Sequence, residues 1–123
     1  EYLLAYSKAL LENKDYDRCN MIINQAKPLS GDPVFHIVQG KCMEQQKLYS
    51  EAEVSYLKAY NRVPHRIYPL FLLMSMYRDQ GLISNAKKIA IKISGIKPKI
   101  PSAEFYEIQD SARAVLNSML ARP

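Results

Sequence analysis

The sequence contains no tryptophan and only four glycines among its 123 residues. Both shortages argue against a loop-rich or barrel-like chain, and no segment alternates apolar and polar residues as a half-buried strand does. Cysteine is also scarce. Cys19 and Cys42 are the only two and lack C-x-x-C spacing, so we expect two reduced thiols rather than a disulfide.

Long hydrophobic runs are missing as well. The longest apolar stretch, residues 68–74, is far shorter than the ~20 residues that a membrane-spanning helix needs. We therefore predict no membrane span in this chain. Glu1 already lies inside a helical pattern, so we expect no signal peptide and regard the chain as a segment of something longer.

Acidic residues are absent from one region. No acidic residue lies between Asp79 and Glu104, in a chain whose net charge is +5. The chain has the size of a single domain. The lysines of this region are Lys87, Lys88, Lys92, Lys97 and Lys99. They form either a solvated helix face and loop or a contact with an anionic membrane surface or glycan. No recognition motif accompanies the charge, so we expect no nucleic-acid partner.

Motifs that carry chemistry are missing too. The sequence has no G-x-S-x-G elbow, no P-loop and no G-x-G-x-x-G. Cys19, His36, Cys42 and His65 lie in three different segments, whereas metal ligands usually come in closely spaced pairs. We therefore expect no enzymatic activity, no catalytic residue, no metal site and no cofactor.

What the sequence does contain is a repeat. The small residues Cys19, Ala52 and Ala86 are 33 and 34 positions apart. We call such a set of equivalent positions a column. Three further columns have the same two spacings of 33 and 34 residues: Ala26, Ala59 and Ile93; Leu10, Met43 and Tyr77; Tyr16, Tyr49 and Ile83. A shared period of this length is typical of stacked helical repeats.

The period and the helix-breaking residues predict where the helices lie. We expect the first helix of each pair near residues 1–13, 33–46 and 67–80, and the second near 16–27, 49–62 and 83–95. A seventh helix should begin at Ser102, a good N-cap. Its apolar residues Phe105, Ile108 and Val115 recur at helical spacing, and we expect them to cover the end of the last pair.

The middle unit resembles the tetratricopeptide family. It reads Gly40-x2-Met43, then Ala52-x3-Tyr56, and ends at Pro64. We expect the small residues Gly40 and Ala52 to let the two helices of the pair approach closely, with Tyr56 filling the space beside them. The family's glycine is present in one unit of three, and its tryptophan in none. The resemblance implies an all-α fold of three tetratricopeptide-like helix pairs plus a C-terminal capping helix, in a right-handed α-α superhelix. The expected domain is 1–123, with repeats near 1–31, 32–65 and 66–98 and the capping helix over 102–121.

Members of this family typically bind an extended peptide or a partner helix on the concave face. We name the residues expected there the inner-face residues: Lys8, Ile37, Lys41, Tyr68, Phe71 and Arg78. They suit a protein or peptide partner with apolar side chains and an acidic group. Alternatively, parts of this face are solvated or covered by other segments. The carboxylate clamp of chaperone-binding members is not expected, because Lys8 alone matches a clamp donor.

A second resemblance is narrower. Residues 61–73, with residues 97–102 and the helix after them, look like the soluble C-terminal tail of bacterial O-antigen ligase and polymerase-like membrane proteins. It implies a non-catalytic protein–protein interaction module at the bacterial inner membrane, with the cytoplasmic side favoured, in surface-polysaccharide assembly. The alternative is a structural repeat domain of an unrelated soluble protein, used for self-association, for example as a homodimer.

Overall fold

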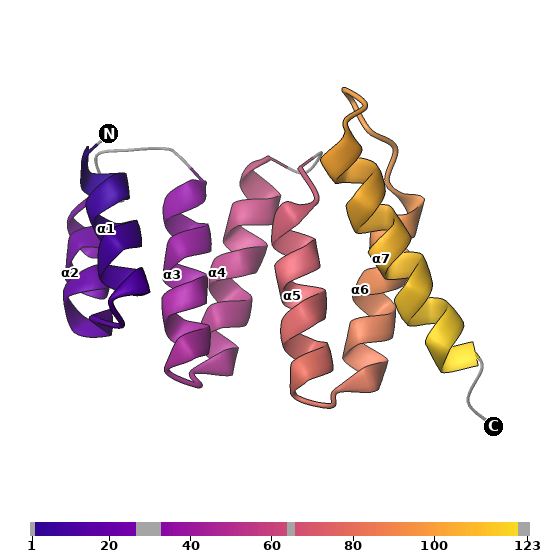
Figure 1. The fold of residues 1–123 in the computed structure, drawn as a ribbon, viewed down its shortest axis with the longest axis horizontal. Helices are drawn as coiled ribbons and strands as arrows, with labels where there is room; N and C mark the ends of the chain where they lie inside the picture. Colours follow the sequence, from indigo (N-terminus) through magenta and orange to yellow (C-terminus); the bar gives the residue numbers. More distant parts are fainter. Residues whose placement is uncertain (1, 27–32, 64–65, 121–123) are drawn as a thin grey trace. The chain divides into compact units, whose positions relative to one another are not determined.

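The computed structural model describes residues 2–26, 33–63 and 66–120, and in this part of the chain all regular secondary structure is helical (Figure 1). The expected all-α class is therefore confirmed. The chain divides into two compact units, Glu1–Arg62 and Val63–Pro123, which we describe separately.

The helix bounds follow the expected ranges to within a few residues. Unit 1 contains α1 (Tyr2–Glu12), α2 (Tyr16–Ala26), α3 (Val34–Gln45) and α4 (Tyr49–Arg62). Unit 2 contains α5 (Tyr68–Asp79), α6 (Ile83–Gly95) and α7 (Ala103–Leu120). The sequence breaks and the hydrophobic period were therefore sufficient to place every helix in the described ranges.

One turn recurs inside all three helix pairs. The residue that reverses the chain has a positive φ each time: 62° at Lys14, 63° at Lys47 and 76° at Gly81. The next residue's N–H donates to the carbonyl five positions back, at 2.8, 2.9 and 2.9 Å: Asp15 to Leu10, Leu48 to Met43, and Leu82 to Tyr77. This is the Schellman arrangement that ends a helix. Its positions are 33 and 34 residues apart, so the backbone repeats with the sequence period.

In unit 1, α1 packs on α2 and α3 packs on α4, and α3 also contacts α1 and α2. The close approach of paired helices expected at Gly40 is confirmed in the α3/α4 pair. A Cβ atom added to Gly40 would lie 2.6 Å from Tyr56 Cδ1. Tyr56 is 1% exposed, and its hydroxyl donates a 2.8 Å hydrogen bond to Glu44 Oε1. Glycine is thus the residue that leaves room at position 40 for this ring.

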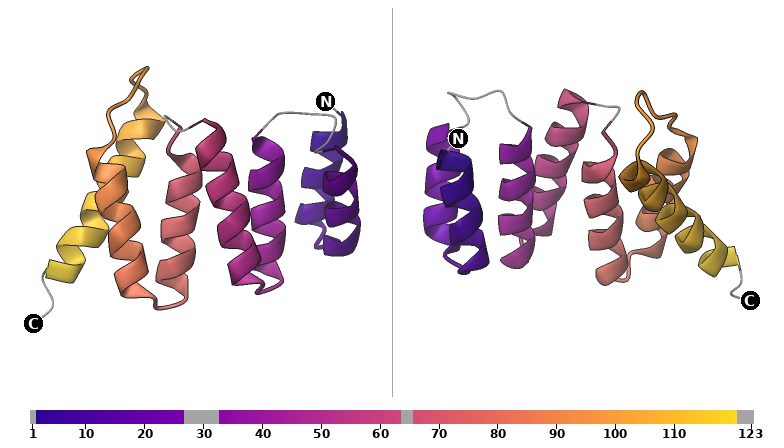
Figure 2. Two further views of the ribbon diagram at one scale, coloured as in Figure 1. Left: turned by 180° about the vertical axis from the view of Figure 1, so that it is seen from behind. Right: turned by 45° about the horizontal axis from the view of Figure 1, so that its top comes forward.

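In unit 2, α5 packs on α6, and α7 lies across both (Figure 2). Ser102 Oγ accepts a 3.1 Å hydrogen bond from Phe105 N–H, so the expected N-cap is present. Phe105, Ile108 and Val115 are buried, as expected of a helix that covers the last pair. Burial extends to residues of the second and third helix pairs: Ala52, Tyr56, Ala59, Tyr77 and Ala86.

Gln109 is a polar residue in this otherwise apolar contact. It is 6% exposed, and its Nε2 donates to the carbonyls of Ile93 at 3.2 Å and Ile96 at 2.7 Å. These carbonyls lie at the end of α6, where the last carbonyl groups of a helix lack N–H donors from a following turn. Gln109 therefore fixes α7 to α6 through hydrogen bonds as well as through apolar packing.

Candidate functional site

Three inner-face residues belong to unit 1. Lys8 is exposed on α1, while Ile37 and Lys41 are half-buried one turn apart on α3. Residues four positions apart share one face of a helix, so Ile37 and Lys41 lie on the same side of α3. Because α1 and α3 contact each other, the three side chains come from neighbouring helices.

The other three belong to α5 in unit 2. The rings of Tyr68 and Phe71 are stacked, with centroids 6.3 Å apart and an interplanar angle of 24°, and both residues are half-buried. Arg78 is exposed in the last turn of the helix. It is seven positions after Phe71, which places both on one side of α5, about 10 Å apart along the axis. Its charge also complements the negative end of the helix dipole.

The structure thus arranges the six residues as two groups, one on each unit. Each group combines a cationic side chain with partly accessible apolar surface. Glu44 lies three residues after Lys41, and its Oε1 accepts the hydrogen bond from the Tyr56 hydroxyl. This bond was not predicted from the sequence, because it depends on how Tyr56 packs against α3.

The two cysteines lie together in the core of unit 1, with Leu10, Ile23 and Val38. Both are free thiols. Cys19 Sγ donates to the Ser7 carbonyl at 3.2 Å, and Cys42 Sγ donates to the Tyr16 carbonyl at 3.6 Å. Burial, followed by the neighbouring Cys42, raises the pKa of Cys19 to about 12, and burial raises the pKa of Cys42.

A thiol with a raised pKa is rarely in the nucleophilic thiolate form. The two cysteines therefore act as small packing residues, in keeping with the column that Cys19 shares with Ala52 and Ala86. His36 is half-buried on α3, and His65 lies outside the described residues. Within the described ranges, no three histidine, cysteine or acidic side chains are grouped as metal ligands would be.

None of the helices in the described part of the chain combines the length and the apolar character required to cross a membrane. Comparison of the chain with protein-family models and with curated protein sequences finds no match. A functional assignment therefore has to come from the residues themselves.

Proposed function

We propose that the chain is a non-catalytic protein–protein interaction module of the tetratricopeptide type. The observation that carries this proposal is the turn repeated at Lys14, Lys47 and Gly81, with the same two hydrogen-bonding positions in each helix pair. Repeats that share one internal geometry bury their apolar faces by stacking on one another. In the proposed arrangement the three pairs stack as a right-handed superhelix, and α7 closes its last pair.

The proposed binding surface is the concave face formed by the inner-face residues. Binding energy at protein interfaces is usually concentrated in a few aromatic and arginine side chains. Tyr68 and Phe71 supply a stacked, half-buried aromatic pair, and Arg78 supplies an exposed cation on the same helix. Lys8 and Lys41 add positive charge from α1 and α3. These chemistries suit an extended segment with apolar side chains and an acidic group.

The parent proposed for this module is a bacterial membrane protein of surface-polysaccharide assembly. Residues 61–73 and 97–102 support this proposal through their likeness to the tails of O-antigen ligase-like proteins. In that setting the module recruits partners at the inner membrane, with the cytoplasmic side favoured, and carries no part of the glycan chemistry.

A displayed peptide library tests the binding surface while the partner is still unidentified. Peptides are selected on the unmodified chain and then titrated against variants by calorimetry. Phe71→Ala and Arg78→Ala should each weaken the selected peptides by about fivefold or more, since truncating an anchor typically costs over ~1 kcal/mol. The matched controls are Tyr106→Ala and Arg113→Ala, an exposed aromatic and an exposed cation on α7.

Two results would contradict the proposal. One is selected peptides that bind the Phe71 and Arg78 variants as tightly as the unmodified chain. The other is a dimer in sedimentation that Phe71→Ala dissociates, because that result assigns the same surface to self-association. Circular dichroism of each variant checks that the helices remain folded.

A further inference from the structure

The outward side of α6 combines positive charge with exposed apolar surface. Lys87, Lys88 and Lys92 are all exposed there, and Ile91 lies between them with 55% of its surface accessible. The opposite side of the helix is the packed one. Its buried residues are Ala86, Ala90 and Ile93.

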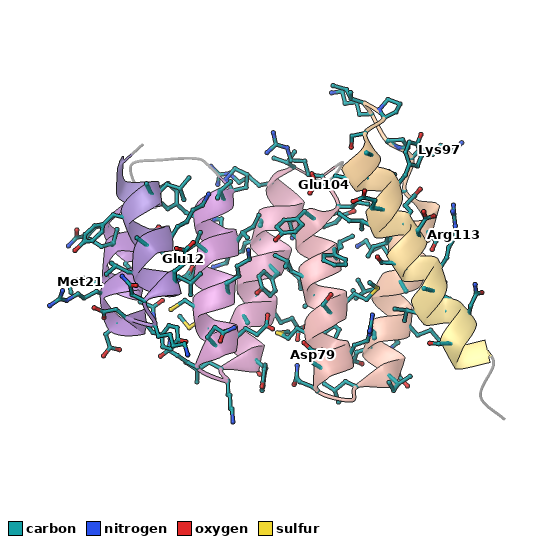
Figure 3. All side chains as sticks on the ribbon, in the orientation of Figure 1. Glu12, Met21, Asp79, Lys97, Glu104 and Arg113 are labelled. Carbon is teal, nitrogen blue, oxygen red and sulfur yellow. The ribbon has the colours of Figure 1, made fainter. Side chains whose placement is uncertain are left out.

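The same composition continues past the end of the helix. Lys97 lies on the segment that joins α6 to α7 (Figure 3) and is exposed. Ile100, three residues later, is 79% exposed, the highest value among the large apolar residues that the structure describes at the surface. We call Lys87, Lys88, Ile91, Lys92, Lys97 and Ile100 the α6 surface. No acidic residue lies between Asp79 and Glu104, so the charge of this stretch has a single sign.

A partner for this surface has to satisfy both of its properties. Positive charge alone fits any polyanion, including a soluble glycan or nucleic acid. Exposed isoleucines among the lysines fit a narrower class, because a membrane interface accepts apolar side chains below a layer of anionic headgroups. Each lysine held near an anionic leaflet strengthens binding by about fivefold.

We propose that the α6 surface docks onto an anionic phospholipid membrane, with lysines at the headgroups and Ile91 and Ile100 entering the interface. The peptide-binding proposal uses α1, α3 and α5, so the two are independent. The α6 surface shares no residue with the inner-face residues.

Vesicle sedimentation tests this directly. The 123-residue chain is mixed with vesicles of phosphatidylcholine and phosphatidylglycerol, and separately with vesicles of phosphatidylcholine alone. We expect binding to the first and little to the second, with a marked decrease at high salt because ions screen the headgroup charge. Replacing Lys87, Lys88 and Lys92 together by Gln should weaken binding by about a hundredfold.

A charge-matched control separates the α6 surface from net charge. Replacing Lys14, Lys47 and Lys58, which are exposed on unit 1, by Gln changes the net charge equally and should weaken binding far less. Ile91→Ser should weaken binding by about fivefold or more through loss of interfacial apolar contact. Its control is Val54→Ser, a change at an apolar residue of similar exposure, 51%, on α4.

Three results would overturn the proposal. The first is an unmodified chain that does not bind the anionic vesicles. The second is an equal loss in the two lysine triple variants, which makes the attraction a matter of net charge. The third is full binding by the Ile91 variant together with complete competition by polyglutamate, which assigns the surface to soluble polyanions.

Discussion

The α3/α4 pair of unit 1 and the α5/α6 pair of unit 2 each have one small and one large residue at two equivalent positions. The two pairs place the small and the large residue on opposite helices. On the first helix, Gly40 is replaced 34 residues later by Met74, and on the second helix Tyr56 is replaced by Ala90. All four residues are buried. The small residue is on the first helix in one pair and on the second helix in the other.

The α1/α2 pair takes an intermediate solution at the same positions, with Ser7 and Ile23, both 0% exposed. Where Gly40 has a larger counterpart in another pair, Tyr56 therefore has a smaller one. Cores tolerate substitution when the total volume is kept. This pattern is the one expected if each pair conserves the combined volume of the two positions rather than the identity of either residue.

The largest effect is expected from removing what covers the last pair. In unit 1 the α1/α2 pair is covered by α3, whereas in unit 2 the α5/α6 pair is covered by α7. Deleting residues 102–123 exposes the apolar surface beneath Phe105, Ile108 and Val115 and removes the hydrogen bonds of Gln109. We expect aggregation and a lower thermal midpoint, measured by light scattering and circular dichroism. A truncated chain that stays monomeric and equally stable would show that α7 is an appendage.

A double-mutant cycle tests the exchange of volume within the α3/α4 pair. Tyr56→Ala should cost about 3 to 5 kcal/mol, because it leaves a cavity the size of a ring. Gly40→Ala should cost about 1 to 3 kcal/mol through overpacking against that ring. Combined with Tyr56→Ala, the Gly40 change should cost almost nothing, since the clash is gone. Additive effects in chemical denaturation would contradict the packing account.

The sequence predicted the helices, their breaks and the Gly40–Tyr56 contact, because each depends on local periodicity or on one recognisable column. It did not predict that the large residue, Met74, would lie on the first helix of the last pair and the small residue, Ala90, on the second. Column matching treats each position alone, whereas packing depends on what two helices contribute together. Gln109 was missed although it lies one turn after Phe105 on the apolar stripe of α7. A glutamine at such a position indicates a buried hydrogen bond, but its acceptors at the end of α6 follow only from tertiary structure.

The inner-face residues illustrate the same limit. Sequence placed Tyr68, Phe71 and Arg78 on one helix, and the stacked rings and the exposed cation follow from their spacing. The joining of these three with Lys8, Ile37 and Lys41 into one surface stays a prediction, because it depends on how successive pairs stack. Residue spacing within a helix is fixed by backbone geometry, but spacing between pairs is not.

A smaller effect is expected from the thiol that distinguishes the first pair. Where α4 and α6 have Ala52 and Ala86, α2 has Cys19, whose pKa burial raises from 9.0 to about 12. The folded state therefore holds this proton more tightly than the unfolded chain. The contribution of this protonated thiol to the free energy of unfolding is complete below about pH 9 and is lost as the pH rises towards 12. At pH 10 the free energy of unfolding is lower by roughly 1 kcal/mol for this reason.

Cys19→Ala gives the first pair the alanine that the other two pairs have at this position. The variant should not show this part of the loss of stability at alkaline pH. Denaturation midpoints measured from neutral pH to about pH 10 should fall less steeply for the variant than for the unmodified chain. Cys42→Ala in addition should flatten the profile further, because burial also raises the pKa of that thiol. Identical slopes for all three chains would mean that neither thiol is protected in the folded state.

The smallest effect concerns the repeated turn, where unit 1 and unit 2 again differ. Lys47 ends α3 with a φ of 63°, and Gly81 ends α5 with a φ of 76°. A side chain with a Cβ is strained in this left-handed region, whereas glycine adopts it freely but loses more entropy on folding. Lys47→Gly should therefore stabilise the chain by about 0.5 to 1 kcal/mol, and Gly81→Lys should destabilise it by a similar amount. No atom lies within 4 Å of a Cβ built on Gly81, so the second change tests backbone strain without a steric clash.

Chemical denaturation of both variants measures the effect. Changes of the same sign at the two sites would show that the two turns are not energetically equivalent, although their backbone geometry is shared.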